Sequence, residues 1–465
     1  MSETIRGMRN MGAAAGDRTD ERYPLRYSAT IHFCVTNYQF CVNRDLRKNR
    51  AMAVADRKVA LLVETSKAFG RGLLAGVGRY ARLHPRWSIY VEERGLDDPI
   101  PRWLLADSSA ADRFDGMLIR SLRLETMKQA SELGIPAVYL GEENPDDVIA
   151  VSSDDRACAR LAAEHLLERH FRSFGYVGLR GYGWSESRRD CFAQCIEQSG
   201  FPCAIIEMST EPRQHEAWYQ HRNELANWIE SLPKPVAVMA CYDATARTLL
   251  DVCRQHHWLV PEQVAVVGVD NDQVLCELSD PPLTSVALDT ETIGYEAARL
   301  LDQRMQANSC ADVKSIKSIV VPPRGVQLRQ STQTDAIDDP EIALALGFIR
   351  RHACDGIGVP DVLAHIAESS NRNTVPKTAL SRRTLERRFH AATGHSPLDA
   401  IREVRIQRVK SLLCESTMKL EEVASSSGFQ YPAYMASQFR ASEGMTPGEY
   451  RKLHSNVSDS VSRPR

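Results

Sequence analysis

Four arginines lie within seven residues in the C-terminal part of the chain: Arg382, Arg383, Arg387 and Arg388. Leu385 lies among them, and Phe389 follows Arg388 directly; the two apolar residues are four apart, which places both on one face of a helix. Such a helix buries the two apolar residues and exposes the arginines. Because guanidinium groups bind phosphate oxygens and the edge of guanine, the pattern is typical of a helix that contacts DNA.

A second, similar pattern follows further along the chain. Gly428 ends a predicted helix and suits its left-handed cap. A further helix is expected from about Pro432 to Ser442, with Tyr434 and Phe439 as its anchors. Its polar side chains are candidates for contacts to bases or phosphates: Gln430, Tyr431, Ser437, Gln438 and Arg440.

Another group of candidate residues follows predicted strands. Asp243 comes soon after the apolar run 236–240, and Glu64, Ser66 and Phe69 follow the run 59–63. In α/β proteins, ligands bind at the carboxyl ends of parallel strands, so these side chains could line a ligand site. Asp243 has an alternative role as the N-cap of a helix.

The elements that would position these side chains alternate along the chain. Apolar runs typical of strands occupy residues 59–63, 116–119, 137–140, 174–177, 236–240, 264–267 and 319–321. Amphipathic stretches typical of helices occupy residues 72–83, 156–167, 186–198, 216–229, 244–253 and 292–305. This alternation predicts βαβ units and parallel sheets. Because the segment is large for one sheet, we predict an α/β fold of two lobes with a cleft between them.

We divide the chain into five parts on these patterns. Residues 1–56 show no sustained period and form an extension, residues 57–330 form the two-lobed sensor, and residues 331–341 form a polar linker. Residues 342–455 are all-α, and residues 456–465 are a flexible tail. The extension has two interpretations: translation beginning at Met52, or an arm whose arginines add nonspecific DNA contacts.

Bulk composition excludes several classes of protein. The net charge of −2 argues against polyanion binding along the whole chain. An apolar run of about 18 residues, which a membrane span needs, is missing. A signal pattern is missing as well, so we expect a cytoplasmic protein. The 12 cysteines lack zinc-ligand spacing, and we expect no metal, no cofactor and no disulfide framework.

From about residue 342 to 452 the chain resembles the AraC family of transcription factors. The matching positions are Leu385, Phe389, Thr393, Gly394, Pro397, Arg405, Arg408, Leu412, Leu413, Val423, Ala424, Gly428, Phe429, Tyr434, Phe439, Gly444, Pro447, Tyr450 and Arg451. The resemblance implies an all-α domain with two helix-turn-helix units. Residues 367–381 are longer than the turn this family uses. The alternative is a solvated helical bundle, because residues 338–455 hold 16 Lys and Arg against 14 Asp and Glu.

Three stretches of the sensor segment resemble the effector domain of the LacI/GalR family: residues 151–169, 264–271 and 279–289. The resemblance implies the fold of periplasmic sugar-binding proteins, and it places Arg188 and Asp270 at sugar-contacting positions. A sugar needs groups that hydrogen-bond its hydroxyls and a ring to stack on, and Trp184 is a candidate for that ring. The alternatives are a turn cap for Asp270 and ordinary packing for Trp184.

The order of the domains restricts which family the whole chain resembles. LacI-type regulators carry their DNA-binding unit before the sensor, whereas here an AraC-type domain follows it. That order resembles the xylose-operon regulators, and the likeness runs from about residue 59 to 451. Glu64 stands where that family has an amide, so the sugar stays open, with xylose as one example.

We therefore predict a homodimeric transcriptional regulator that binds double-stranded operator DNA under the control of a sugar. If it activates, RNA polymerase is a further partner. A sugar-acting enzyme is one alternative, although no nucleophile-elbow, Walker, zinc-protease or dinucleotide fingerprint occurs and we name no catalytic residue. A sugar-binding transport protein is the other, although no export signal is present.

Overall fold

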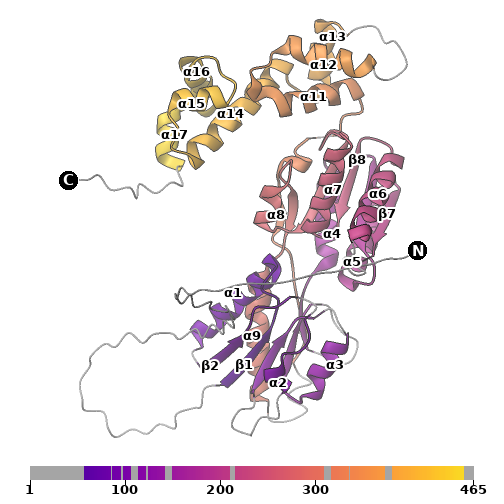
Figure 1. The fold of residues 1–465 in the computed structure, drawn as a ribbon, viewed down its shortest axis with the longest axis vertical. Helices are drawn as coiled ribbons and strands as arrows, with labels where there is room; N and C mark the ends of the chain where they lie inside the picture. Colours follow the sequence, from indigo (N-terminus) through magenta and orange to yellow (C-terminus); the bar gives the residue numbers. More distant parts are fainter. Residues whose placement is uncertain are drawn as a thin grey trace, which may run out of the picture. The chain divides into compact units, whose positions relative to one another are not determined.

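The computed structural model describes residues 57–84, 86–95, 98–105, 114–121, 124–141, 149–209, 215–307, 316–334, 336–371 and 380–454. Within these residues, two α/β lobes are followed along the chain by a helical domain (Figure 1). The predicted extension 1–56 and tail 456–465 lie outside the described residues. None of the described helices is long and apolar enough to cross a membrane.

The first lobe is a six-stranded parallel sheet with the order β11-β5-β4-β3-β1-β2. Its strands are β1 (Arg57–Leu62), β2 (Trp87–Val91), β3 (Gly116–Ile119), β4 (Ala137–Leu140), β5 (Ala150–Ser153) and β11 (Ile319–Val321). Its helices are α1 (Ala68–Leu83), α2 (Arg102–Leu105), α3 (Leu124–Glu132) and α9 (Thr290–Gln306). Helices α1 and α9 cover one face of the sheet and α2 and α3 the other (Figure 1). Because both faces are covered, the central strands are continuously apolar.

Two glycines allow α1 and α9 to touch. A Cβ on Gly76 would lie 2.0 Å from the carbonyl oxygen of Glu291, and a Cβ on Gly294 would lie 2.0 Å from that of Leu73. The glycines near the first helix therefore serve close packing.

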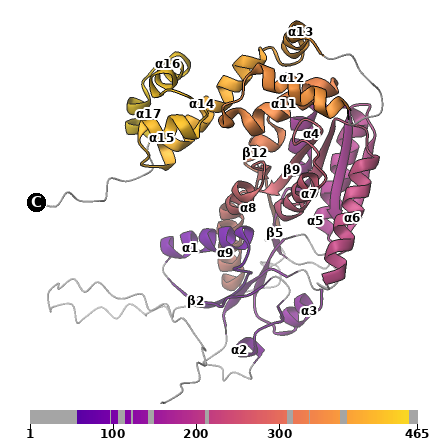
Figure 2. The ribbon, with the colours of Figure 1, turned by 45° about the horizontal axis from the view of Figure 1, so that its top comes forward.

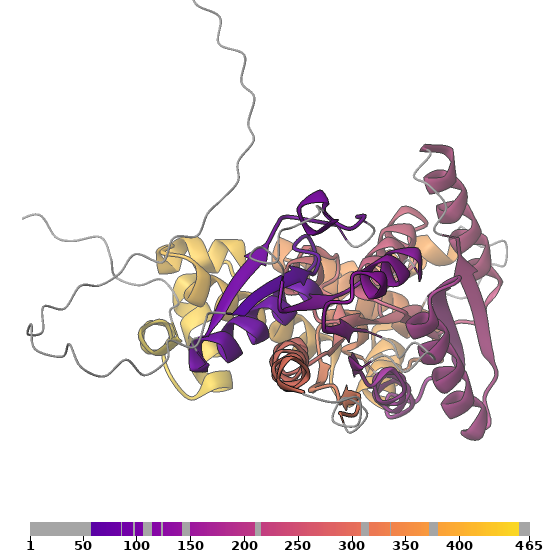
Figure 3. The ribbon, with the colours of Figure 1, turned by 90° about the horizontal axis from the view of Figure 1, so that it is seen from below.

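The second lobe is a six-stranded sheet with the order β12-β10-β9-β8-β6-β7. Its strands are β6 (Ser173–Leu179), β7 (Cys203–Met208), β8 (Val236–Ala240), β9 (Val264–Asp270), β10 (Thr284–Ala287) and β12 (Gly325–Gln327). Strand β12 is antiparallel to β10, and the other pairs are parallel. Helices α4 (Asp155–Leu167) and α5 (Gly183–Gln198) cover one face. Helices α6 (His215–Ser231) and α7 (Asp243–Gln255) cover the other (Figure 3), and α8 (Gln273–Leu278) follows β9.

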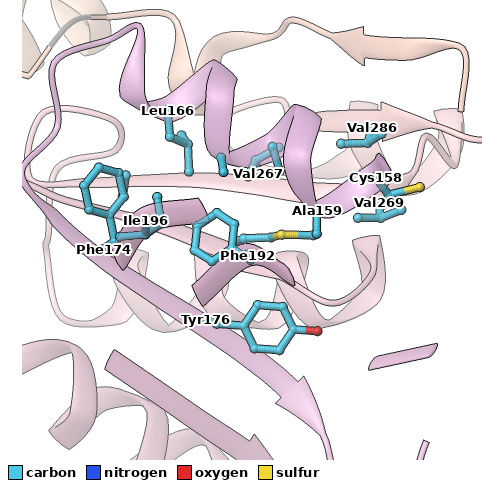
Figure 4. Packing of buried hydrophobic residues seen from close by; sticks show 14 of the residues in the cluster. Cys158, Ala159, Leu166, Phe174, Tyr176, Phe192, Ile196, Val267, Val269 and Val286 are labelled. Atoms are coloured by element: carbon cyan, nitrogen blue, oxygen red, sulfur yellow. The ribbon is translucent and has the colours of Figure 1, made fainter. Parts of the chain in front are cut away.

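The core between the second sheet and helices α4 and α5 is aromatic and aliphatic (Figure 4). Phe174, Phe192 and Leu166 are almost fully buried there. Tyr176 is also buried, and its hydroxyl donates to the carbonyl oxygen of Ser185 at 2.7 Å. This bond fixes the first turn of α5. Helix α5 carries two of the predicted ligand residues, Trp184 and Arg188.

The chain passes between the two sheets three times, at residues 153–155, 287–290 and 321–325. The predicted fold of two α/β lobes is therefore confirmed. Strands predicted at 116–119, 137–140, 236–240 and 319–321 match β3, β4, β8 and β11.

The helical domain contains α11 (Pro340–His352), α12 (Val359–Asn371), α13 (Arg382–Thr393), α14 (Pro397–Glu415), α15 (Leu420–Ser426), α16 (Pro432–Glu443) and α17 (Pro447–His454) (Figure 2). It has two hydrophobic cores, and α14 contributes Ile401 to the first and Val409 to the second. The predicted pair of helix-turn-helix units corresponds to α12 with α13 and to α15 with α16. Most of the longer first turn, residues 372–379, lies outside the described residues.

The two units end in the same way. Helix α13 stops at Gly394, with φ 77°, and α16 stops at Gly444, with φ 75°. Ser396 then caps α14 by accepting the N–H of Asp399, and Thr446 occupies the matching position before α17. The repeated glycine and hydroxyl-proline pattern in the sequence thus produces the same local structure twice.

The structure differs from the predicted linker 331–341 at both ends. Ser331 and Thr332 are fully buried. The hydroxyl of Ser331 donates to the carbonyl oxygen of Val266 at 2.6 Å, and that of Thr332 lies 2.8 Å from Nε2 of His165. At the other end, α11 already begins at Pro340. These polar residues looked like a linker because their hydrogen bonds, rather than apolar contacts, hold them in place.

Candidate ligand site and nucleic-acid interface

Asp270 is the last residue of β9 and has an unusual backbone. Its φ is 110°, and that of Asn271 is 52°, although neither residue is glycine. No hydrogen bond from the described residues reaches the Asp270 carboxylate. Burial raises the pKa of this carboxyl, while the positive charges of Arg188, Arg120 and Lys67 act in the opposite direction. An unpaired carboxylate on strained backbone is typical of a binding site.

Arg188 lies on α5 and is only 4% exposed. Its Nε donates to Asp155 at 2.8 Å, and one terminal nitrogen donates to the carbonyl oxygen of Cys241 at 2.6 Å. The guanidinium is therefore fixed, with N–H donors left over. Asp155, which opens α4 at the crossing between the lobes, was not among the predicted site residues.

Trp184 lies beside Arg188 and contacts two further aromatic rings. The ring centre of Trp184 lies 5.0 Å from the guanidinium carbon, and 5.8 Å from the ring of Tyr242. The ring centres of Tyr182 and Trp184 lie 5.7 Å apart. Trp184 is half-buried against the core of the lobe, which agrees both with the predicted stacking ring and with the alternative of ordinary packing. Tyr242 follows β8 and was not predicted.

In the first lobe, Glu64 is completely buried. One carboxylate oxygen pairs with Arg120, and the other has no hydrogen-bond partner among the described residues. The Arg120 guanidinium lies 4.3 Å from the ring centre of Phe69. Arg120 directly follows β3, so the rule that selected Asp243 from the sequence could also have found it. Ser66 is exposed, and its carbonyl oxygen accepts from Arg71.

The two lobes bring these groups close together. The Lys67 ammonium of the first lobe lies 5.5 Å from the ring centre of Tyr242 in the second. Arg120 and Lys67 also act electrostatically on Asp270. The predicted residues Arg188, Asp270, Trp184 and Phe69 therefore belong to one neighbourhood.

Asp243 has a different place from the one predicted. Its side chain is 1% exposed. One oxygen accepts from the hydroxyl of Ser285 at 2.6 Å, and the other accepts from the N–H of Asp272 at 2.7 Å. The N-cap alternative is also wrong, because Tyr242 is the cap residue of α7. Asp243 supports the turn after Asp270 instead of facing a ligand.

Helix α13 exposes Arg382, Arg383 and Arg387 and buries Leu385 and Phe389, as predicted. Within the helix, Arg382 donates to Glu386 at 2.9 Å.

The prediction for Arg388 disagrees with its position. Its guanidinium donates to Asp339 at 2.7 Å and to Glu341 at 2.6 Å. Both carboxylates belong to the start of α11, so Arg388 ties two helices together and does not face DNA.

Helix α16 presents a second polar face. Gln430 and Tyr431, which directly precede the helix, and Ser437 and Arg440 within it are exposed, and Gln438 is half-buried.

The predicted anchors of this helix are partly corrected. Phe439 is fully buried, but Tyr434 is 47% exposed. Met435 is the second buried anchor. Met435 and Phe439 are four residues apart and share the buried face of the helix. Tyr434 is five residues before Phe439, so it lies on the outer face.

The described residues hold no cluster of His, Cys, Asp and Glu that could bind a metal ion. The chemistry of the site is that of hydrogen bonds, ion pairs and aromatic contacts.

Comparisons with known proteins agree with this architecture. A periplasmic binding protein-like domain matches residues 163–332, and a helix-turn-helix domain matches residues 376–453. The HTH-type transcriptional regulator CelR of Thermobifida fusca is 28% identical over 272 residues, which are 57% of this chain and 77% of that protein.

Longer matches cover both domains. The xylose operon regulatory protein of Escherichia coli K12 is 30% identical over 412 residues, which are 86% of this chain and 98% of that protein. Its counterpart in Haemophilus influenzae is 30% identical over 400 residues. A solved structure of the xylose-binding transcription activator XylR matches with a TM-score of 0.70 and 28% identity, covering 86% of this chain and 98% of that one. The chain therefore belongs to the xylose operon regulatory protein family and is a sugar-responsive, DNA-binding transcription regulator.

Proposed function

We propose that a neutral pentose such as D-xylose binds between the lobes against Asp270 and Arg188 and controls the binding of a homodimer to operator DNA. The observation that carries this proposal is the unpaired Asp270 carboxylate, held beside a fixed guanidinium and the ring of Trp184. A carboxylate and a guanidinium form paired hydrogen bonds with adjacent hydroxyls, and the ring packs on the C–H face of a sugar.

The charges of the neighbourhood favour a neutral ligand. Three cations and three carboxylates lie there: Lys67, Arg120, Arg188, Glu64, Asp155 and Asp270. Arg188 pairs with Asp155 and Arg120 with Glu64. The remaining charges, Lys67 and Asp270, also balance, so the neighbourhood has no net charge to attract an acidic or a basic sugar, which supports an uncharged one. The names of the similar proteins, which refer to xylose, support the same choice.

Glu64 would contribute directly to the site. Its second oxygen is buried without a partner among the described residues, which is costly unless a donor arrives. A sugar hydroxyl is a donor of the required kind. We expect Glu64 to influence which sugar binds.

On the DNA side, α13 and α16 would act as recognition helices. Two such helices in one chain would enter successive major grooves about 34 Å apart. A homodimer would then contact two pairs of grooves. RNA polymerase would be a partner if the regulator activates transcription.

Calorimetric titration with D-xylose, D-ribose, L-arabinose and D-xylonate tests the ligand. We expect a neutral pentose to bind and xylonate to fail. Asp270→Ala should weaken binding roughly 10- to 100-fold, because a hydrogen bond to a charged group contributes about 1.5–3 kcal/mol.

Arg188→Ala should weaken binding similarly, whereas Arg172→Ala should leave it unchanged. Arg172 is an exposed arginine of the same lobe at the opposite end of β6. Unchanged affinity in both the Asp270 and Arg188 variants would overturn the proposed site.

A further inference from the structure

The turn that carries Asp270 needs external support. Two consecutive residues that are not glycine, Asp270 and Asn271, have φ values of 110° and 52°. Residues with a Cβ rarely adopt these backbone angles, and the angles persist only where the surrounding structure fixes them. Something in the lobe must therefore hold this turn.

Two buried side chains bind the turn on its inner side. The N–H of Asn271 donates to the Ser285 hydroxyl at 2.9 Å, and the N–H of Asp272 donates to Asp243 at 2.7 Å. Ser285 and Asp243 are joined by a hydrogen bond of 2.6 Å. Ser285 is fully buried and Asp243 is 1% exposed. The two backbone N–H groups that follow Asp270 therefore donate to one hydrogen-bonded, buried pair, Ser285 and Asp243.

The sheet leaves room for this pair. A Cβ on Gly268 in β9 would lie 2.2 Å from the carboxylate oxygen of Asp243. Glycine at this position leaves space for the Asp243 carboxylate beside Ser285, which pairs with Gly268 across β9 and β10.

The outer side of the turn is held as well. The Arg329 guanidinium donates to the Asn271 side-chain oxygen at 2.8 Å and to the carbonyl oxygen of Leu283 at 2.9 Å. The turn is thus bound from both sides, while the Asp270 carboxylate accepts no hydrogen bond from the described residues. The support reaches the backbone around Asp270 but not its side chain.

We propose that Asp243 and Ser285 are positioning residues, which hold the Asp270 carboxylate in the orientation that receives the ligand without touching the ligand themselves. The inference rests on the proposed role of Asp270 in sugar binding. Asp243 then acts on affinity through its hydrogen bonds to the turn.

Ser285→Ala tests the pair, with Ser331→Ala as the matched control. Both serines are fully buried in the second lobe, and both hydroxyls bond a backbone N–H. Ser331 bonds the N–H of Thr284 and the carbonyl oxygen of Val266, and neither N–H of the turn. The two variants should therefore lose similar stability, but only Ser285→Ala should disturb Asp270.

Hydrogen exchange measured by NMR on the full chain gives the first readout. The amides of Asn271 and Asp272 should exchange slowly in the parent. Both should exchange at least about tenfold faster in Ser285→Ala and Asp243→Ala, and at the parental rate in Ser331→Ala. Equal exchange in all variants would overturn the proposal whether or not a sugar binds.

Titration with D-xylose gives the second readout. The dissociation constant should rise about tenfold in Ser285→Ala and Asp243→Ala and stay within twofold of the parent in Ser331→Ala. Asp243→Asn should largely retain affinity, because its amide can accept from Asp272 and donate to Ser285. An affinity loss in Asp243→Asn equal to that in Asp243→Ala would overturn positioning through hydrogen bonds. If the parent fails to bind any neutral pentose, the proposed function fails, while the exchange measurement still decides the support of the turn.

Discussion

At the scale of single residues, the same side-chain type takes opposite roles according to its neighbours. Arg387 and Arg388 are adjacent on α13, yet Arg387 is exposed and Arg388 is bound by Asp339 and Glu341. Asp270 and Asp243 differ in the same way, because only Asp243 has its oxygens occupied by protein donors. Burial and partners, and not residue type, separate the supporting groups from those available to a ligand.

The two arginines provide a paired test. Arg387→Ala should weaken DNA binding by about 1–3 kcal/mol if it contacts a base, or reduce the salt slope by roughly one if it contacts a phosphate. Its effect on unfolding should be small. Arg388→Ala should instead lower the free energy of unfolding by about 1–2 kcal/mol, because it leaves two partly buried carboxylates without their cation.

Denaturant unfolding and fluorescence anisotropy on the same preparations separate these effects. An Arg388 variant that unfolds like the parent but loses DNA affinity would return this residue to the DNA-binding face.

At the scale of elements, the sequence predicted most of the central strands, the long helices and the edge strand β11, but it missed the edge strands β2, β7 and β12 and the inner strands β5 and β10. Strands β3, β4 and β8 are continuous apolar runs because helices cover both of their faces. Edge strands β2 and β7 have exposed or half-buried residues throughout most of their length, and β5 ends in two serines, so none has a strong apolar signal.

The site was only partly predictable for a similar reason. Asp270 and Arg188 came from family resemblance, while Arg120, Tyr242 and Lys67 come together only when separate strand ends meet. The spacing of these residues in the sequence does not predict that they lie close together in the fold. The buried hydroxyls of Ser331 and Thr332 escaped prediction because their partners are far away in sequence.

The contact between α1 and α9 gives a prediction at this scale. Gly76→Ala should destabilise the protein by about 1–3 kcal/mol, because the new methyl group would meet rigid backbone of α9. Gly78→Ala is the control in the same helix, where the nearest atom is the end of the Arg82 side chain at 3.5 Å. It should be neutral or stabilising by up to about 1 kcal/mol, since alanine favours helix.

Thermal unfolding of the two variants measures the difference. Equal shifts in melting temperature would contradict the tight contact between these helices.

At the scale of the whole molecule, α4 connects two regions of the second lobe. Its first residue, Asp155, holds Arg188, and near its end His165 bonds Thr332. Thr332 belongs to the segment that continues into the helical domain. The helix thus links the ligand neighbourhood to the part of the chain that leads to the DNA-binding units.

His165 makes this connection sensitive to acid. Burial, together with the nearby Arg169, lowers its pKa from 6.5 to about 4. The unfolded chain therefore binds a proton below pH 6.5 that the folded chain takes up only near pH 4. Stability should fall as the pH drops through this window, by on the order of 3 kcal/mol.

Urea unfolding at pH 7.0 and pH 4.5 measures the loss. His165→Gln should remove most of this contribution, because the amide can bond Thr332 without titrating. The same pH dependence in the parent and in this variant would assign the acid sensitivity to other groups.

The most direct test of the account measures DNA affinity with and without D-xylose. Duplexes chosen by the full chain from a random-sequence pool supply the operator, and fluorescence anisotropy gives the dissociation constant. The account predicts that D-xylose changes this constant at least about tenfold for the parent, and that Asp270→Ala binds the duplex but no longer responds, because a ligand shifts an equilibrium only through differential affinity. A parent that ignores the sugar, or an Asp270→Ala variant that responds like the parent, would contradict it.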